Sequence, residues 1–454
     1  MINLFEYQNK EAFDGDFSEL ETFLDDIWLK REKSGFYYSA DQERIESQRF
    51  LQFLHKTNEI KSNRYIGVIH FDGRKINLLP KILYNHNEKC TDENVQSSHL
   101  HVLWWLSYCR KIKFPNYQTS MGNTKSDFFE ILIYLFSKYT RELLSNTIYQ
   151  HYEEEQKELP FIKGRIQTSE YITENLSKGR WHKVNCAYDA FIIDNKFNRI
   201  IKQVTTMLFQ TTENWENKKH LREILFILDE VSDCQSTADE CANIQFNPMF
   251  SSFETVRDYC TLFLRNCVSF SYKNELKLFA FLLPMEYVFE DFIFGFIDRE
   301  IEDIQAKAQV TTTYLDKNKA YQLKPDLLLK IGERRVITDT KYKMVYADEQ
   351  DLKNGISQSD IYQMVAYGIR FKINEIVLLY PDTIKGDKLQ QSSIIVRDEF
   401  ADDVEVNIKA FQLPVIHRTL LNDHTISENR TILEIFEETK LSLKDRIMEI
   451  YFRL

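Results

Sequence analysis

The segment KPDLLLKIGERRVITDTKYK (residues 324–343) decides the fold of the C-terminal part of the chain. It contains two leucine-rich or β-branched runs, and a turn through residues 331–334 can return the second run beside the first. Asp326 opens the first run, and Asp339 and Lys341 close the second. Because residues two apart in a strand point to the same face, we expect Asp339 and Lys341 to share a face and the two aspartates to meet at adjacent strand ends.

The two carboxylates and the lysine have the chemistry of a metal-dependent phosphodiesterase site. Mg²⁺ is bound in proteins by one or two carboxylates and keeps waters and substrate phosphate in its other positions. The metal can activate a water and stabilise charge on a phosphodiester oxygen, while a nearby ammonium orients the nucleophile or neutralises the phosphorane. Asp326 and Asp339 lie in runs typical of buried strands, where an unpaired carboxylate is costly, so we expect them to have a function.

A chance match is the alternative, since short motifs of this type recur without function. The chain contains a second Pro-Asp pair, Pro381-Asp382, with no D-x-K or E-x-K in the thirty residues that follow it. We expect that pair to be an ordinary strand-to-loop turn, so only Pro325-Asp326 fits the motif.

Two helical segments can complete the site. PMEYVFEDFIFGFI (residues 284–297) presents Glu286 and Glu290 four residues apart on one helix face, and one of them can supply a third carboxylate. The alternative is a solvated stripe on an otherwise apolar helix.

The second helix, SQSDIYQMVAYGIRF (residues 357–371), places Asp360, Gln363 and Tyr367 at positions i, i+3 and i+7. This stripe can face a scissile phosphate or the metal site, and an ordinary helix surface is its alternative.

Three parts can be distinguished along the chain, and together they predict an α+β multidomain fold. Residues 1–120 are β-rich, because RYIGVIHFDGRKINLLPKIL (residues 64–83) forms two partly alternating runs around Asp72-Gly73, a strong hairpin signal. The second part, residues 121–270, is mostly helical. Its expected helices are residues 126–152, 195–209, 218–231 and 252–266.

The third part, residues 271–454, begins with a strongly apolar helix that carries embedded carboxylates, from residue 275 onward. Two β-type runs, a helix and a strand follow, in the order β-β-α-β, and this order predicts an α/β domain on a mixed sheet. These four elements are expected at residues 321–329, 335–342, 360–371 and 375–380.

Composition excludes several classes of protein. The 454 residues include 69 acidic and 58 basic side chains, and the net charge of -11 argues against a protein that coats nucleic acid through bulk charge. The seven cysteines form no C-x-x-C pair and are expected to be reduced core thiols. There is no export signal and no apolar stretch long enough to span a membrane, so we expect a cytoplasmic protein with no membrane contact. There is also no complete phosphate-binding loop, so we do not expect the chain to bind a nucleotide by such a loop.

The C-terminal part resembles the PD-(D/E)xK nuclease superfamily, whose domain is restriction-endonuclease-like. Longer strings resemble one branch of it, the McrC family, the nuclease subunit of McrBC-type restriction systems that are specific for modified DNA. These strings span about residues 64–380 and are GVIHFDGRKINLLPKIL, LPFIKGRI, YDAFIIDNKFNRIIK, FED and SDIYQMVAYG.

The resemblance implies a role for each matched residue. Asp326 and Asp339 would be ligands of Mg²⁺, with Lys341 as the catalytic lysine. Glu290 would be the helix carboxylate that completes the acidic set and the metal ligands. Gln363, with Tyr367, matches the helix that supports the active site.

The resemblance also implies partners. Such a chain would act on double-stranded, modified DNA together with McrB, a AAA+ GTPase ring that recognises the modified base. Residues 1–120 would engage the central pore of the ring and stimulate GTP hydrolysis, and nuclease domains would pair for double-strand cleavage.

Two other functions stay open from the sequence. One is a non-catalytic adaptor that binds and stimulates the ring NTPase, and the other is a RecB-like repair exonuclease of the same superfamily. An intact Asp326, Asp339 and Lys341 set favours catalysis, and the scattered cysteines argue against the iron–sulfur relatives.

Overall fold

The protein is described here from a computed structural model, and the chain divides into two compact units. The first unit contains Met1–Ile131 and Arg265–Leu454, and the second contains Leu132–Leu264. The residues that the structure describes are 1–30, 50–85, 90–110, 128–271, 277–308, 313–345, 353, 355–384, 389–398, 404–422 and 431–452. The division into three parts, residues 1–120, 121–270 and 271–454, stays a prediction.

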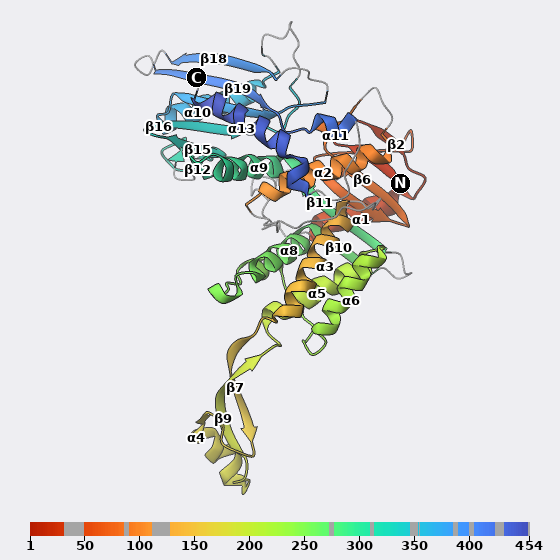
Figure 1. Cartoon of the computed structure of the whole chain (residues 1–454), viewed down its shortest axis with the longest axis vertical. Coiled ribbons are helices and arrows are strands. Elements are labelled where there is room, and N and C mark those ends of the chain that lie inside the picture. The colour runs from red at the N-terminus through yellow and green to blue at the C-terminus, as the bar shows by residue number, and fades with distance from the viewer. Residues whose placement is uncertain are drawn as a thin grey trace. The chain divides into compact units, whose positions relative to one another are not determined.

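A five-stranded sheet forms the first layer of the first unit (Figure 1). Its strands, in spatial order, are β1 (Ile2–Phe5), β6 (Arg74–Leu79), β5 (Tyr65–Phe71), β11 (Lys277–Pro284) and β10 (Cys267–Ser271). The hairpin predicted around Asp72-Gly73 is confirmed, because β5 and β6 pair in antiparallel register with a turn of positive φ at both residues.

The central pair of this sheet joins distant parts of the chain. Strand β11 pairs in antiparallel register with β5, and Leu282 lies opposite Gly67. A Cβ added at Gly67 would lie 1.9 Å from the carbonyl oxygen of Phe281, and the φ of Gly67 is +135°. Only glycine fits this approach, so the sequence of β5 is adapted to a strand more than 200 residues downstream.

A small sheet and one helix complete the N-terminal core. The sheet contains β2 (Lys10–Ala12), β4 (Glu59–Ser62) and β3 (Leu51–Leu54), and the helix is α1 (Phe17–Lys30). Their apolar side chains pack with those of β5, β6 and β11 in one cluster. Its largest members are Phe13, Phe23, Phe50, Tyr65 and Phe71.

Helices α2 (Asp92–Tyr108) and α9 (Met285–Glu300) pack against each other in the first unit. Helix α2 begins at a capping box formed by Thr91 and Asn94. It packs against α9, where a Cβ added at Gly295 would lie 1.9 Å from the carbonyl oxygen of Tyr108. The glycine therefore allows close helix packing.

The second sheet of the first unit has six strands and carries the segment with which the sequence analysis began (Figure 1). In spatial order they are β12 (Gln305–Ala308), β15 (Leu327–Ile331), β16 (Arg334–Thr340), β17 (Glu375–Pro381), β19 (Val404–Leu413) and β18 (Gln391–Asp398). Strands β16, β17 and β19 are parallel and the other pairs are antiparallel, so the predicted mixed sheet is confirmed.

Helices cover both faces of this sheet. Helix α10 (Gln358–Phe371) packs Met364 and Tyr367 on the face that contains Ile337. Tyr451 of α13 (Glu437–Phe452) hydrogen-bonds Thr338, whose side chain points to the opposite face because neighbouring side chains of a strand alternate. The remaining elements of the unit are η2 (Lys81–Leu83), β13 (Thr313–Tyr314), β14 (Gln322–Leu323), α11 (Arg418–Asn422) and α12 (Ile432–Ile435).

The second unit combines a helical body with a projecting arm (Figure 1). Its helices are α3 (Phe128–Asn146, which begins in the first unit), α5 (Lys196–Thr211), α6 (Trp215–Ile227), α7 (Ala238–Ala242), η5 (Pro248–Phe250) and α8 (Phe253–Asn266, which ends in the first unit). The arm, residues 151–192, contains β7 (His151–Leu159), β8 (Arg165–Ile166), β9 (Val184–Ile192) and three short helical turns, α4 (Thr168–Glu170), η3 (Tyr171–Asn175) and η4 (Leu176–Lys178).

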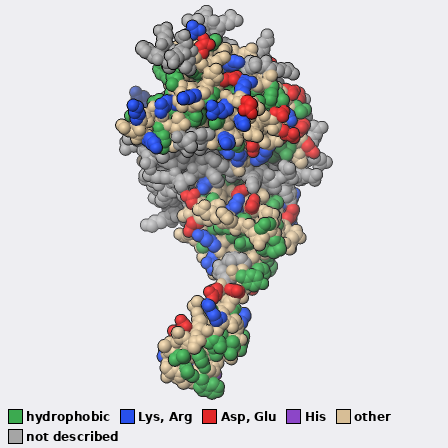
Figure 2. Space-filling view, turned by 90° about the vertical axis from the view of Figure 1, so that its left-hand side faces the viewer, with side chains coloured by type: hydrophobic (Ala, Val, Ile, Leu, Met, Phe, Trp, Pro, Cys, Tyr) green, Lys and Arg blue, Asp and Glu red, His purple; other side chains and the backbone are tan. Residues whose placement is uncertain are grey.

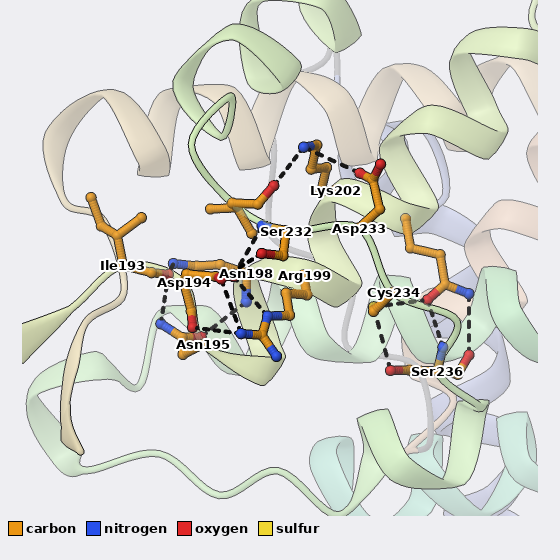
Figure 3. Close-up of polar contacts among 12 residues, drawn as sticks. Ile193, Asp194, Asn195, Asn198, Arg199, Lys202, Ser232, Asp233, Cys234 and Ser236 are labelled. Carbon is orange, nitrogen blue, oxygen red and sulfur yellow. Dashed lines mark hydrogen bonds and ion pairs between the residues drawn. The ribbon is translucent and has the colours of Figure 1, made fainter. Parts of the chain in front are cut away.

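Side-chain amides hold the base of the arm together. The Nδ2 atoms of Asn195 and Asn198 each donate to the carbonyl oxygens of Tyr149 and Ile193, which flank β7 and β9. The carboxylate of Asp194 accepts hydrogen bonds from Arg199 and from Ser232 (Figure 3). These contacts explain the polar residues of the string YDAFIIDNKFNRIIK.

Two helix predictions were wrong in part. The helix expected at residues 126–152 ends at Asn146, because β7 begins at His151 and pairs with β9, a partner that local spacing does not reveal; residues 126 and 127 lie outside the described residues. The apolar helix expected from residue 275 is β11 as far as Pro284 and becomes α9 only at Met285. A short apolar run does not distinguish a buried strand from a buried helix.

Two further observations bear on the class of protein. No helix in the described part of the chain is long and apolar enough to cross a membrane. Of the cysteines described, Cys109, Cys186, Cys241 and Cys260 are buried free thiols, whereas Cys90 is exposed and Cys234 is half-buried.

Candidate active site

The predicted hairpin brings the two aspartates to the same end of neighbouring strands. Strands β15 and β16 are antiparallel, with Leu327 opposite Thr338. Asp326 directly precedes β15 and Asp339 directly follows Thr338, so the register continues to these two residues. Gly332, with a φ of +59°, occupies the turn that joins the strands.

Asp326 is fixed by the next strand. Its Oδ2 atom accepts hydrogen bonds from the Thr340 backbone N at 2.8 Å and from Thr340 Oγ1 at 3.0 Å. Burial raises the pKa of Asp326, although the charge of Lys341 and the two hydrogen bonds oppose this shift. One carboxylate oxygen, Oδ2, is thus held firmly by Thr340.

Asp339 is the least satisfied acid of the site. Its side chain is 1% exposed and forms an ion pair with Lys341 Nζ. Within the described residues, neither of its carboxylate oxygens accepts a hydrogen bond of ordinary geometry. Burial, together with the charge of Asp326, raises the pKa of Asp339 to about 7. A buried carboxylate in this state would be stabilised further by a bound cation in addition to Lys341.

Lys341 remains charged beside the acids. Burial acts to lower its pKa, but the charges of Asp339 and Asp326 outweigh burial and raise the pKa above the usual value for lysine. The side chain is 18% exposed. A lysine that stays protonated cannot serve as a general base, and it can neutralise negative charge on a phosphate.

Helix α10 completes one side of the site. Lys341 Nζ donates to Gln363 Oε1 at 3.3 Å, and Gln363 Nε2 donates to Tyr367 Oη at 2.8 Å. The Tyr367 hydroxyl donates to the carbonyl oxygen of Lys324 at 3.0 Å, and burial raises the pKa of this phenol to about 12. Of the two interpretations of the polar stripe, the structure therefore favours the one in which Gln363 and Tyr367 face the site.

Asp360 belongs to the same stripe and lies close enough to act electrostatically on Asp339. It is paired with Lys343 Nζ at 2.8 and 2.9 Å. Sequence analysis did not single out Lys343 or Thr340, although both lie within two residues of Asp339 or Lys341 in the same segment.

The third carboxylate stays a prediction. Glu286 is exposed, and its charge acts on Arg64 and on Glu6 in the N-terminal part of the unit. Glu290 is half-buried one turn further along α9. The neighbouring Phe289 packs against Tyr342, with ring centroids 5.8 Å apart, so this turn of α9 lies near the end of β16.

The donor set fits Mg²⁺ better than a metal that needs a complete protein cage. Two carboxylates converge, and one of them has unsatisfied buried oxygens. Across the part of the chain that the structure describes, no group of three or more His, Cys, Asp or Glu side chains is arranged to hold an ion. Mg²⁺ requires only one or two carboxylates, whereas structural Zn²⁺ takes four protein ligands.

The family is decided by a match over residues 60–381. A family model described as McrBC 5-methylcytosine restriction system component matches this range, which is more than half of the chain and includes both aspartates and Lys341. The chain belongs to this McrBC family. No curated protein sequence is similar enough to the chain to count as a relative.

Two solved structures have a similar fold, and both come from Thermococcus gammatolerans. One is a half-complex from a tetradecameric assembly of McrB AAA+ hexamers with bound McrC; its chain is 18% identical, with a TM-score of 0.66, and 98% of the present chain and 99% of that chain are covered. The other is the McrBC complex. Its chain is 19% identical, with a TM-score of 0.50, and 66% of the present chain and 87% of that chain are covered. At these identities the likeness shows the fold, so the site of this McrBC component must be judged from its own residues.

The second Pro-Asp pair differs from the expected simple turn in one respect. Pro381 ends β17, as predicted, but Asp382 is buried rather than solvated. It accepts a hydrogen bond from the Val415 backbone N at 3.0 Å and pairs with Arg418 at 3.3 Å. Burial raises the pKa of Asp382 to about 7. Its partners within the chain give Asp382 a structural role.

Proposed function

We propose that the chain is a Mg²⁺-dependent DNA endonuclease, the nuclease subunit of a McrBC-like restriction system, with a PD-(D/E)xK domain built on the six-stranded sheet. One observation carries the proposal: the buried carboxylate of Asp339, which pairs with Lys341, lies beside the carboxylate of Asp326 at adjacent strand ends. An adaptor without catalytic activity has no need for such an arrangement in a core strand.

In this mechanism Asp326 and Asp339, with Glu290 as the third candidate ligand, hold Mg²⁺. When bound, the metal supplies an activated water and stabilises charge on the phosphodiester. Asp339 would bind the cation in its ionised form, because a carboxylate ligand must be deprotonated. Lys341, held between Asp339 and Gln363, keeps its ammonium directed at the phosphate and neutralises the charge that develops there.

The partner in this proposal is a AAA+ GTPase ring of the McrB type, since the neighbouring solved chain is McrC bound to McrB AAA+ hexamers. The substrate is modified double-stranded DNA, which agrees with the 5-methylcytosine system of the family description. Nuclease domains would pair to cut both strands, in the cytoplasm where such DNA is met. The net charge of -11 gives the free chain weak, salt-sensitive affinity for DNA, so delivery falls to the ring.

Two surfaces are candidates for contact with the ring. The first is the N-terminal part, residues 1–120, as the resemblance implies. The second is the arm, which exposes large apolar side chains on a narrow ribbon (Figure 2). The most exposed are Tyr152, Phe161, Ile162 and Trp181, at 69%, 59%, 64% and 71%. Apolar groups gathered on an exposed surface mark interaction sites, so the arm is our preferred candidate.

The proposal is tested with the purified full chain and plasmid DNA, methylated and unmethylated. We expect cleavage only when Mg²⁺, the partner GTPase and GTP are all present, and EDTA should abolish it. Cleavage by the chain alone, without regard to methylation, would instead indicate an autonomous nuclease such as a repair exonuclease. Stimulated GTP hydrolysis without any cleavage would indicate the adaptor.

A further inference from the structure

A buried carboxylate from the first strand of the chain meets the end of the candidate catalytic strand. Glu6, which directly follows β1, is 1% exposed, and Tyr342, which directly follows Lys341, is 3% exposed. The Tyr342 hydroxyl donates to Glu6 Oε2 at 3.0 Å. The two residues are 336 positions apart in the sequence, yet both lie in the first unit.

The surroundings of Glu6 make this contact specific. Its backbone N donates to the carbonyl oxygen of Leu79 at 3.0 Å, and its Oε2 also accepts from the Lys81 backbone N at 3.2 Å. Lys81 Nζ lies 4.4 Å from the centroid of the Tyr342 ring. Burial raises the pKa of the Glu6 carboxyl to about 7, and the nearby charge of Lys81 opposes this shift. The Glu6 carboxylate is therefore held in place by contacts with Leu79 and Lys81 that do not involve Tyr342.

Tyr342 and Lys341 point to different sides of the chain. Lys341 contacts Asp339 and Gln363, whereas Tyr342 contacts Glu6 and Phe289. The main chain at this point is also fixed, because the Lys341 N donates to Leu379 O at 2.8 Å and the Lys343 N donates to Lys341 O at 2.8 Å. Because successive side chains of an extended chain point to opposite sides, anchoring Tyr342 on one side fixes the position of the Lys341 Cα atom, from which the lysine side chain extends on the other side.

We propose that Glu6 and Tyr342 are a positioning pair for Lys341, so that a strand of the N-terminal sheet holds the ammonium of the nuclease site in place. The inference rests on the proposed function and extends it, because it makes the N-terminal sheet a working part of the nuclease centre. A displacement of about 1 Å at a group that meets the transition state can lower a rate by roughly a hundredfold.

The experiment compares Glu6→Ala, Glu6→Gln and Tyr342→Phe in the full chain with partner, GTP and saturating Mg²⁺. We expect Glu6→Ala and Tyr342→Phe to lower kcat for plasmid cleavage by roughly ten- to a hundredfold, with KM for DNA and stimulated GTP hydrolysis unchanged. Glu6→Gln keeps an oxygen acceptor for the tyrosine and should retain most of the activity. The double variant Glu6→Ala/Tyr342→Phe should be no slower than the slower single variant, because both remove one interaction.

A matched control is Tyr451→Phe. Tyr451 is also buried, and its hydroxyl pairs with Thr338 at 2.7 Å on the opposite face of the same strand, so the control removes a similar buried hydrogen bond away from Lys341. We expect normal kcat for this variant.

Three outcomes would overturn the positioning role. They are unchanged kcat in Glu6→Ala and Tyr342→Phe, an equal loss in Tyr451→Phe, and losses in kcat that follow a fall in melting temperature and GTPase stimulation. A crystal structure of Glu6→Ala supplies a readout that does not depend on cleavage, because Lys341 Nζ should leave Asp339. If the wild-type chain cuts no DNA, the proposed function fails. The crystal structure of Glu6→Ala then shows by itself whether Glu6 and Tyr342 position Lys341.

Discussion

Two aspartates, one in each unit, show how differently the same side chain can be used. Asp339 in β16 is almost fully buried, has unsatisfied oxygens and has a pKa raised to about 7 by burial and by Asp326. Asp194, at the base of the arm, accepts hydrogen bonds from Arg199 Nε at 2.7 Å, Arg199 Nη2 at 3.0 Å, Ser232 N at 3.0 Å and Ser232 Oγ at 2.7 Å (Figure 3). The Arg199 hydrogen bond, with those from Ser232, holds the pKa of Asp194 well below its usual range.

The difference separates a carboxylate that stabilises the fold from one that we propose as a metal ligand. A structural acid is surrounded by donors, which favour its charged form. Asp339 is buried beside two other acids, Asp326 and Asp360, and one lysine, Lys341, and this environment makes its charged form costly. To distinguish a structural acid from a candidate ligand, it is therefore more useful to ask whether the carboxylate oxygens accept hydrogen bonds than whether the side chain is buried.

The largest expected effect is on catalysis. Asp339→Ala should lower Mg²⁺-dependent DNA cleavage by on the order of a hundred- to a thousandfold, because it removes the proposed metal ligand and the partner of Lys341. Stimulated GTP hydrolysis should stay nearly normal. Plasmid cleavage and GTPase assays on the same preparation measure both. Loss of GTPase stimulation in a folded Asp339→Ala protein would contradict a nuclease site that is separate from the partner contact.

Replacement of the lysine should have the next largest effect. Lys341→Ala should lower kcat by roughly a hundredfold with little change in KM for DNA, since its charge is needed as negative charge develops on the phosphate. Lys341→Arg should recover only part of the rate, because a planar guanidinium does not match the contact with Gln363. Full activity of Lys341→Ala would remove the lysine from the mechanism.

The structural aspartate should behave in the opposite way. Asp194→Ala should lower the free energy of unfolding by about 1 kcal/mol, because it removes the hydrogen bonds from Arg199 and Ser232, whose donors water can then reach. The nuclease kcat of the folded protein should be unchanged. Urea denaturation measures the first quantity and plasmid cleavage the second.

A neighbouring acid provides the control for this substitution. Asp233 pairs with Lys202 at 3.2 Å, but its side chain is 90% exposed. Asp233→Ala should leave stability nearly unchanged, since exposed ion pairs contribute little. An equal loss of unfolding free energy in Asp194→Ala and Asp233→Ala would show that the hydrogen bonds of Asp194 do not account for its contribution to stability.

The smallest expected effect is on how the melting temperature, measured in EDTA, changes with pH. Asp339 and Asp194 should change it in opposite directions. The folded-state pKa of Asp339 is raised, so the native state binds more protons than the unfolded state between about pH 4 and 7, and stability falls as pH rises through this window. Asp339→Asn removes this loss and should melt roughly 2 °C above wild type at pH 8.

Asp194 has a lowered folded-state pKa, so its contribution is present above about pH 4 and is lost as pH falls below it. Asp194→Asn should therefore melt below wild type at pH 8 and approach it in acid. The same sign of change for both asparagine variants would contradict the contrast between the two acids.

Local sequence was informative where the partners are close in the chain. Asp326 and Asp339 are joined by one short hairpin, so strand alternation and a turn were enough to predict that they meet. Gln363 and Tyr367 share a helix face, and their spacing likewise indicated that they act together.

Contacts between distant segments could not be predicted in this way. Nothing around Glu6 indicates a tyrosine 336 residues away, and the arm was missed because β7 is a charged strand whose partner lies beyond a helical tip. The apolar run of β11 shows no periodicity that distinguishes a strand from a helix until its pairing with β5 is known.

That pairing has a consequence for how the protein is made. Strand β5 is complete at Phe71, but its neighbour β11 begins only at Lys277, so at ordinary translation rates β5 waits roughly 10–40 s for its partner. During that time the nascent chain carries an unpaired apolar strand edge, which is a template for aggregation. Any N-terminal fragment that ends before Pro284 keeps this edge permanently. We therefore expect recombinant fragments of the N-terminal sheet that lack β11 to aggregate more readily than fragments that include it.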